Sequence, residues 1–332
     1  MRSRNSLSQN FNSARSFFQL FRDIMSKSFW REETMKKPVL VVLAMIAVYV
    51  FWGGTYLGMK IALVSFTPAI MAGIRHLSAG LILFAIARVR KDPFPKLDEI
   101  KNAAIVGILL LLIGNGLVAW AEQRVPSAIA SLMVASVPLW ITLMNWRFGE
   151  RKQPSIQQMS GVILGIFGIA LLVMKSSGGG VDTFDIIGLL ALLLASLSWS
   201  AGSLYSRLAK LPASPFNNVS TQMITGGVLL LLFATLRNEW VLVDFNALDF
   251  NAVLAMGYLI FFGSVVAYTS YIWLMKNVNP TWVSTYAFVN PIVAVFLGWW
   301  IGKETLQGTA LVSALIILTA VVIITLSQRS KR

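Results

Sequence analysis

The 332-residue chain contains no cysteine and one histidine, His76, and only 13% of its residues are charged. The absence of cysteine excludes a disulfide framework and thiol chemistry. The chain also has no cluster of metal ligands, no Walker-type phosphate-binding loop and no nucleophile paired with its histidine. These absences predict a protein that is not an enzyme and that binds no metal and no cofactor.

What the chain has in excess is apolar sequence, since 56% of its residues are hydrophobic. The apolar residues form continuous runs of about 20, the length that crosses a bilayer as a helix. A barrel strand would alternate apolar and polar residues instead. We therefore expect an all-α integral membrane protein with ten transmembrane helices. The ten runs lie at 38–64, 68–88, 101–121, 126–147, 155–175, 184–209, 215–236, 249–275, 280–302 and 305–327.

The lysines and arginines that give the net charge of +14 are distributed unevenly between the two sides of the expected spans. If both termini are cytoplasmic, 22 of the 28 lysines and arginines lie on the cytoplasmic side and 4 on the other, and Lys60 and Arg75 fall within spans. The positive-inside rule then predicts a multi-pass protein with both termini in the cytoplasm. The basic charge is a topology signal, so nucleic acid is not an expected partner.

The first 37 residues differ from the rest because arginine and serine recur in them. They read as a basic cytoplasmic tail, or as an over-extended start if translation begins at Met35. Other readings are an amphipathic helix on the membrane surface and an organellar transit peptide. The apolar face of such a helix would comprise Phe11, Ala14, Phe18, Phe21 and Met25.

Two stretches of the chain resemble each other, "VPSAIASLMVASVPLWITLMNWRFGE" at 125–150 and "NPTWVSTYAFVNPIVAVFLGWWIGKE" at 279–304. In each, a proline near the start and a glutamate at the end are 24 residues apart. The similarity predicts two halves of five spans, 38–175 and 184–327. Because five is odd, the second half enters the membrane upside down. Such inverted repeats are typical of secondary transporters, although a channel or an enzyme can also have one.

Two basic residues lie inside expected spans. Arg75 falls about 20 Å above the cytoplasmic surface, counted at 1.5 Å per residue from the flanking charges. An arginine there needs a partner, either a structural one such as Glu122 or a substrate anion. Lys60 reaches the outer interface, where it either extends to water or serves a gate or a substrate. His76 is expected to be packed and neutral. No carboxylate lies near the midplane, so we do not expect a carboxylate proton relay.

Pro138 and Pro291 fall near the midplane of spans four and nine. Each removes a backbone donor and interrupts its helix. Interrupted helices in corresponding positions of two halves point to a central site, so the two prolines are candidate hinges. Simple packing kinks are the alternative. Ser136 and Asn290 lie beside the interruptions.

Aromatic and amide side chains at similar depth would suit an amphipathic or zwitterionic small molecule. The candidate substrate-binding residues are Trp52, Tyr56, Lys60, Arg75, Asn115, Ser136, Trp199, Tyr286 and Asn290.

The sequence resembles the drug/metabolite transporter superfamily, specifically the EamA-type ten-helix exporters of bacteria. The resemblance covers about residues 38–327. The stretches that show it are "WGGTYLGMK", "AGIRHLSAG", "VPSAIASLMVASVPLW" with "FGE", and "NPTWVSTYAFVNPIVAVFLGWWIGKE".

The resemblance implies two inverted EamA repeats around a central cavity in the bacterial inner membrane. Lys60 and Arg75 match positions where the family often has a basic residue. The pairs Gly149–Glu150 and Lys303–Glu304 match its motif at helix ends. The basic tail at 1–37 departs from the family's usual short N-terminus.

We expect a secondary transporter that exports small metabolites, amino acids or amphipathic drugs by alternating access. The expected partners are a small-molecule substrate and the lipid bilayer, and the residues do not indicate an oligomeric state. Two alternatives remain open. One is a nucleotide-sugar type carrier, although phosphates need more intramembrane basic residues than Arg75 alone. The other is a membrane scaffold or accessory subunit without transport.

Overall fold

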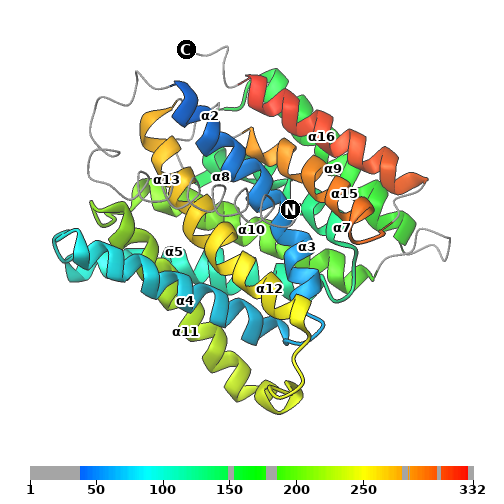
Figure 1. Ribbon diagram of the computed structural model, residues 1–332. Coiled ribbons are helices and arrows are strands. Elements are labelled where there is room, and N and C mark those ends of the chain that lie inside the picture. Colours follow the sequence, from blue (N-terminus) through cyan, green and yellow to red (C-terminus); the bar gives the residue numbers. More distant parts are fainter. Residues whose placement is uncertain are drawn as a thin grey trace, which may run out of the picture.

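The computed structural model describes residues 38–148, 153–176, 185–278, 283, 285–304 and 308–327. The tail at 1–37 and Glu150 lie outside the described residues. Within the described part, every regular element is helical (Figure 1). This agrees with the all-α expectation.

The first half of the chain supplies a series of helical segments, several of them joined end to end. In chain order they are α2 (Pro38–Ala47), η3 (Val48–Trp52), α3 (Gly53–Ala62), α4 (Pro68–Val89), α5 (Leu97–Gly107), η4 (Ile108–Asn115), α6 (Gly116–Ala121), α7 (Ser127–Val134), α8 (Val137–Phe148) and α9 (Ile156–Ser176).

The second half follows a similar plan. Its segments are α10 (Ile186–Leu208), α11 (Pro215–Leu236), the 3₁₀ turn η5 (Glu239–Leu242), α12 (Phe250–Tyr258), η6 (Leu259–Val266), α13 (Ala267–Asn277), α15 (Tyr286–Trp300) and α16 (Thr309–Ser327). The segments η3, η4 and η6 are π-helical, and each joins two α-helices into one rod.

The residues at several helix starts explain why the helices begin there. Pro68 and Pro215 stand at the first positions of α4 and α11, where a missing N–H leaves no intrahelical bond unmade. The Asp185 carboxylate accepts a hydrogen bond from the Gly188 N–H and caps α10. The Asp249 carboxylate likewise accepts from the Asn251 N–H and caps α12.

Seven of the described helices are long and apolar enough to cross a membrane. They are Val39–Ala62, Pro68–Val89, Leu97–Ala121, Ser127–Phe148, Ile186–Leu208, Pro215–Leu236 and Phe250–Tyr271. Three shorter apolar helices, Ile156–Leu171, Val289–Trp300 and Leu311–Ile324, fall within the expected spans five, nine and ten. The count of ten therefore stays a prediction.

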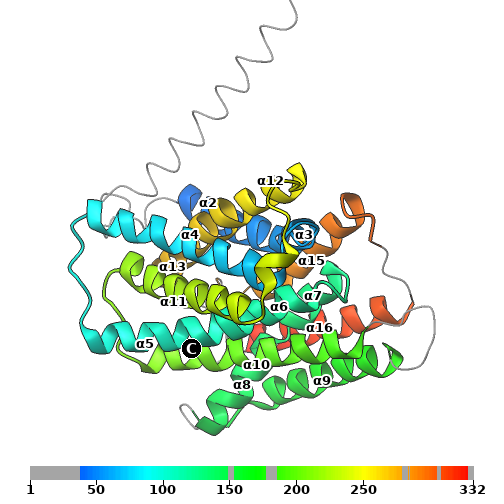
Figure 2. The ribbon, with the colours of Figure 1, turned by 90° about the horizontal axis from the view of Figure 1, so that it is seen from below.

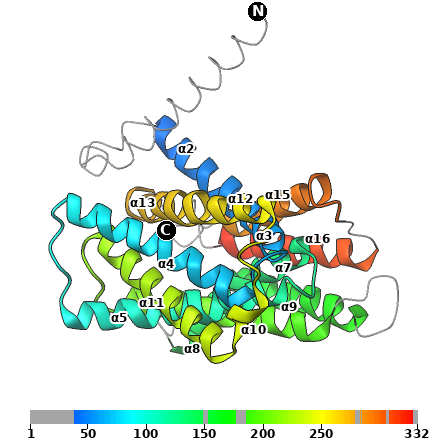
Figure 3. The same cartoon turned by 60° about the horizontal axis from the view of Figure 1, so that its bottom comes forward.

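The long helices lie side by side in an elongated bundle (Figures 2 and 3). The most extensive pairing joins α4 to α11, and the next joins α9 to α16, so each pair links the two halves of the chain. Glycine permits the first pairing, because a Cβ on Gly227 would lie 2.5 Å from the Leu77 nitrogen. The two backbones are therefore in direct contact.

The outer surface of the α9–α16 pair is apolar. Ile163 and Phe167 of α9 are 63% and 58% exposed, and Leu315 of α16 is 67% exposed. Exposed side chains of this size would favour aggregation in water. On a membrane protein they form the surface that contacts lipid tails.

The interruption expected at Pro138 lies slightly before it. Helix α7 ends at Val134 and α8 begins at Val137, so Pro138 is the second residue of α8. Serines of α10 bond to carbonyls at the break, since the Ser196 hydroxyl donates to Met133 O and the Ser200 hydroxyl to Val137 O, both at 3.2 Å. The side chains of α10 thus compensate for the interrupted helix.

Pro291 behaves differently, because it lies inside α15 rather than at a break. Helix α15 begins five residues earlier, at Tyr286. The hydroxyl of Thr285, just before this start, is hydrogen-bonded to the Tyr49 hydroxyl of η3. The hinge role of both prolines remains a prediction.

Candidate functional site

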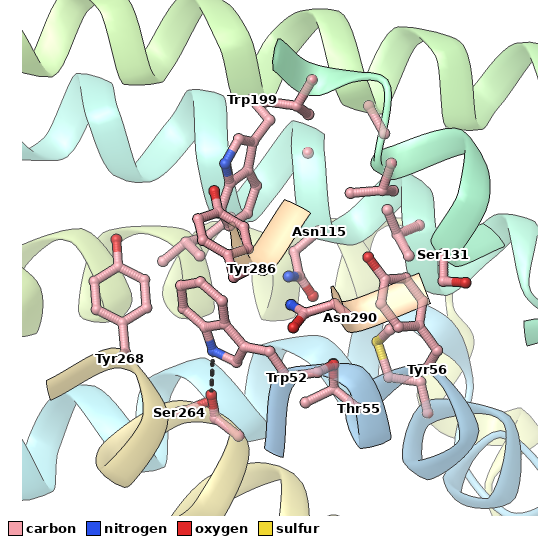
Figure 4. Close-up of a pocket in the computed structure, with 18 of the residues that line it drawn as sticks. Trp52, Thr55, Tyr56, Asn115, Ser131, Trp199, Ser264, Tyr268, Tyr286 and Asn290 are labelled. Atoms are coloured by element: carbon pink, nitrogen blue, oxygen red, sulfur yellow. Dashed lines mark hydrogen bonds between the residues drawn. The ribbon is translucent and has the colours of Figure 1, made fainter. Parts of the chain in front are cut away.

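A cavity of about 100 Å³ lies in the middle of the bundle (Figure 4). Both halves of the chain contribute to its wall. Seven of the nine candidate binding residues line it, together with Pro291: Trp52, Tyr56, Arg75, Asn115, Trp199, Tyr286 and Asn290.

The three π-helical segments all reach this cavity. Trp52 is the last residue of η3, Asn115 the last of η4, and Ser264 lies within η6, and all three line the wall. A π-segment widens one turn and rotates the residues that follow it, and such segments occur often at functional sites. Here the widened turns from three helices meet at one place.

The Trp52 indole is fixed in the wall by several neighbours. Its Nε1 donates a hydrogen bond of 3.0 Å to Gly263 O, the dashed line in Figure 4. Its ring lies 5.9 Å from Tyr268, 5.1 Å from Tyr271 and 5.2 Å from Tyr286, between ring centroids. Aromatic rings in such edge and tilted contacts attract each other. Trp52, Tyr268 and Tyr286 of this cluster form an aromatic side of the cavity.

Arg75 of α4 is the basic residue in the wall, and it is 4% exposed. Its Nε donates a hydrogen bond of 3.0 Å to the Ser264 hydroxyl of η6. No ion pair within 4.0 Å joins it to Glu122, which is also described, so the structural partner is a serine from the second half. The Arg75 Nη1 is buried and has no hydrogen-bond partner among the described residues.

Amide side chains face the same space. Asn115 and Asn290 come from the two halves of the chain and point into the same part of the cavity in Figure 4. The Asn290 Oδ1 is buried and without a hydrogen-bond partner in the described structure. A buried guanidinium nitrogen and a buried amide oxygen without partners carry a desolvation cost that a bound polar molecule would remove.

Lys60 and Ser136 are not among the residues that line the cavity, and their role in substrate binding stays a prediction. The Lys60 side chain is 40% exposed, and its Nζ donates to Val125 O at 3.2 Å and lies 3.8 Å from Glu304 Oε1. The Ser136 hydroxyl donates to Met133 O at 2.5 Å and accepts from Trp140 Nε1 at 3.0 Å.

Glu304 joins the two halves at the end of the bundle where Lys60 lies. Its carboxylate accepts hydrogen bonds from the Ser127 N–H at 3.0 Å, the Ser127 hydroxyl at 2.9 Å and the Ala128 N–H at 3.3 Å. These are donors at the start of α7, where a helix favours negative charge. We call Lys60, Ser127 and Glu304 the latch.

Several wall residues were missed in the sequence. Thr55, Met59, Ser131 and Ser264 all line the cavity. Met59 directly precedes Lys60, but none of the others stands beside a proline or a charge that would single it out. His76 was expected to be packed, and it is 1% exposed, but it also lines the cavity.

The sequence matches the model of the EamA-like transporter family twice, over residues 39–174 and 186–326. The chain belongs to this family. It is 37% identical to the Uncharacterized inner membrane transporter YedA of Escherichia coli strain K12, over 86% of this chain and 90% of that protein. It is 24% identical to the Uncharacterized transporter YoaV of Bacillus subtilis strain 168, over 84% of this chain and 94% of that one.

A solved chain described as "Crystal structure of protein" shares the fold, with a TM-score of 0.61. It is 18% identical and covers 87% of this chain and 98% of its own length. The matches to the EamA family model and to YedA confirm the EamA resemblance read from the sequence. The protein is a multi-pass membrane transporter and not an enzyme, and it contacts the lipid bilayer and a small-molecule substrate.

Proposed function

We propose that this EamA transporter binds small metabolites, amino acids or amphipathic drugs in the central cavity and exports them across the bacterial inner membrane. The observation that carries the proposal is the buried Arg75 Nη1, which has no hydrogen-bond partner among the described residues, next to an aromatic wall of the cavity. A structural arginine would have its donors satisfied within the protein.

The cavity suits a molecule with an anionic end, a cationic or donor end and an apolar body. The Arg75 guanidinium would bind a carboxylate through charge-assisted hydrogen bonds. The Asn290 Oδ1 would accept from an ammonium group, and the faces of Trp52 and Tyr286 would contact an apolar or cationic part. A zwitterionic amino acid meets all three requirements.

Export would proceed by alternating access between two inverted five-helix repeats, residues 38–175 and 184–327, ten helices in all. The latch would close the outer end of the cavity in one state. The repeats would move about the break before Pro138 and about the start of α15, near Pro291. This arrangement would place both termini in the cytoplasm.

The proposal is tested by flux into proteoliposomes, with a mixed pool of labelled amino acids and amphipathic cations. We expect saturable transport of at least one component. The Arg75→Ala variant should lose it by about tenfold or more, because a charge-assisted hydrogen bond contributes about 1.5–3 kcal/mol. Arg237→Ala, at the exposed end of α11, is the matched control and should transport normally.

Wild-type flux that is unchanged in folded Arg75→Ala protein would contradict the assignment of the site. A wild-type protein that is folded and inserted but transports none of the pool would contradict the proposed substrate class. In that case the scaffold and nucleotide-sugar alternatives become the next hypotheses.

A further inference from the structure

Glu122 is a buried carboxyl group that the proposed binding site does not use. It follows α6 directly and is 1% exposed. Its backbone N–H donates to Val118 O at 3.0 Å, but neither Oε1 nor Oε2 has a hydrogen-bond partner in the part of the chain that the structure describes. Buried glutamates are rare unless they are paired. This one calls for a functional explanation.

The charges around Glu122 belong both to the cavity and to the latch. Lys60 of α3 and Glu304 after α15 act on it from the latch, and Arg75 of α4 acts on it from the cavity wall. Tyr56 of α3, which lines the cavity, is also within electrostatic range. Among the described residues none of the cations lies within 4.0 Å of Glu122.

Two further charges near Glu122, Arg124 and Asp185, pair with each other. Helix α10 packs against α6, and Asp185 at its start lies 3.6 Å from the Arg124 Nε. Arg124 also lies over the Trp120 ring, at 4.0 Å from its centroid. Neither residue is therefore a free counter-ion for Glu122.

A carboxylate without donors or a close cation is costly to bury, whereas the neutral acid is not. Water or a cation that comes closer would favour the ionised form again. The group can therefore change protonation when the surrounding helices move. A change in the charge of Glu122 would affect both the cavity wall and the latch, because Arg75 of the wall and the charges of the latch interact with the same carboxyl group.

We propose that Glu122 is the proton-binding site that couples export to the entry of one proton per exported molecule. This inference rests on the proposed export function. The ionised form would attract Lys60 away from Glu304 and loosen the latch, so that the loaded cavity opens outward. A proton from outside would then neutralise Glu122, Lys60 would return to Glu304, and the proton would be released on the cytoplasmic side.

A proton fits this site better than a metal cation does. Sodium and divalent cations need several oxygen ligands around one point. The described residues hold no group of three or more His, Asp or Glu side chains that could bind a metal ion. Lys60 and Arg75, moreover, would repel a second cation.

The first test is chemical and needs no substrate. Dicyclohexylcarbodiimide reacts with protonated carboxyl groups in apolar sites. We expect it to modify Glu122 of the purified full-length protein, detected by peptide mass spectrometry, with less modification as the pH rises. The modification at position 122 should be absent from the Glu122→Gln variant. In the Glu239→Gln control, Glu122 should still be modified. A Glu122 peptide that stays unmodified at pH 6 would overturn the proposal.

The second test measures coupling with the same labelled pool. An inside-acidic gradient of one pH unit should concentrate a transported component about tenfold in wild-type proteoliposomes, the ratio set by one-to-one exchange. Glu122→Gln should lose this accumulation and keep exchange with preloaded substrate. Glu122→Asp should retain part of it, and Glu239→Gln all of it.

Accumulation that survives in Glu122→Gln, or that follows a sodium gradient instead, would overturn the coupling role. Exchange in the preloaded vesicles separates the two proposals. If the wild type shows no exchange, the export function fails, and the carbodiimide reaction still decides whether Glu122 binds a proton. If exchange is present and the pH gradient has no effect, only the coupling proposal fails.

Discussion

At the scale of single residues, Asn290 and Asn217 show how similar side chains can serve different purposes. Both are buried asparagines within helices. Both ends of the Asn217 amide form hydrogen bonds within the protein. Its Oδ1 accepts from Arg88 Nη2 and its Nδ2 donates to Pro93 O, both at 2.7 Å. The Asn290 Oδ1 has no partner among the described residues and lines the cavity.

We therefore expect opposite effects from the same substitution. Asn290→Ala should weaken substrate binding by about 5- to 30-fold, the equivalent of about 1–2 kcal/mol, and leave thermal stability nearly unchanged. Asn217→Ala should lower stability by about 2–3 kcal/mol, because it leaves the partly buried Arg88 Nη2 without its acceptor, and should leave affinity unchanged. Affinity for the transported component and melting of the purified protein would measure both. Equal effects on binding would contradict the assignment of Asn290.

Much of the wall at this scale could be read from the sequence. Counting residues from the flanking charges gave the depth of Trp52, Asn115 and Trp199, and all three line the cavity. Depth does not give the face of the helix, and Lys60 and Ser136 are not among the residues that line the cavity. The π-segments rotate the residues after them, and no sequence pattern announced this rotation. Ser264, the hydrogen-bond partner of Arg75, lies within the π-segment η6 and was missed in the sequence.

At the scale of elements, the latch fixes the start of α7 to the segment after α15. Glu304 does so by accepting three hydrogen bonds from residues of the other half. The sequence located the repeated proline and glutamate that frame these segments. It did not show that Glu304 caps α7, because that contact joins residues 177 positions apart. Asp185 caps α10 in a similar way, but within its own helix.

Breaking the latch should open the cavity at the end of the bundle where Lys60 and Glu304 lie. Because the chain has no cysteine, a Ser131→Cys variant carries a single thiol in the cavity wall. We expect an impermeant maleimide to label this thiol several-fold faster when Glu304→Ala is added, since the α7 donors lose their acceptor. Adding Asp185→Ala instead removes a cap without opening the cavity, so its labelling rate should match that of Ser131→Cys alone. Equal rates in all three proteins would rule out a gating role for the latch.

At the scale of the whole molecule, composition predicted the class of protein most directly. Low charge, long apolar runs and the resemblance to EamA exporters led to a membrane transporter, and family membership confirms it. The pairing of α4 with α11 could not be foreseen, because it depends on backbone contact at glycines such as Gly227 rather than on a hydrophobic pattern. The orientation in the membrane still rests on the distribution of lysine and arginine.

That orientation can be tested with single thiols on opposite ends of the bundle. Asn246 lies in the exposed loop before α12, and Lys96 lies in the exposed loop before α5. The positive-inside rule places Asn246 outside and Lys96 in the cytoplasm. In intact cells an impermeant maleimide should label Asn246→Cys, and it should label Lys96→Cys only after permeabilisation. The cysteine-free parent chain gives the background. The reverse pattern would place the latch on the cytoplasmic side, and the proposed direction of proton movement through Glu122 would have to be reversed with it.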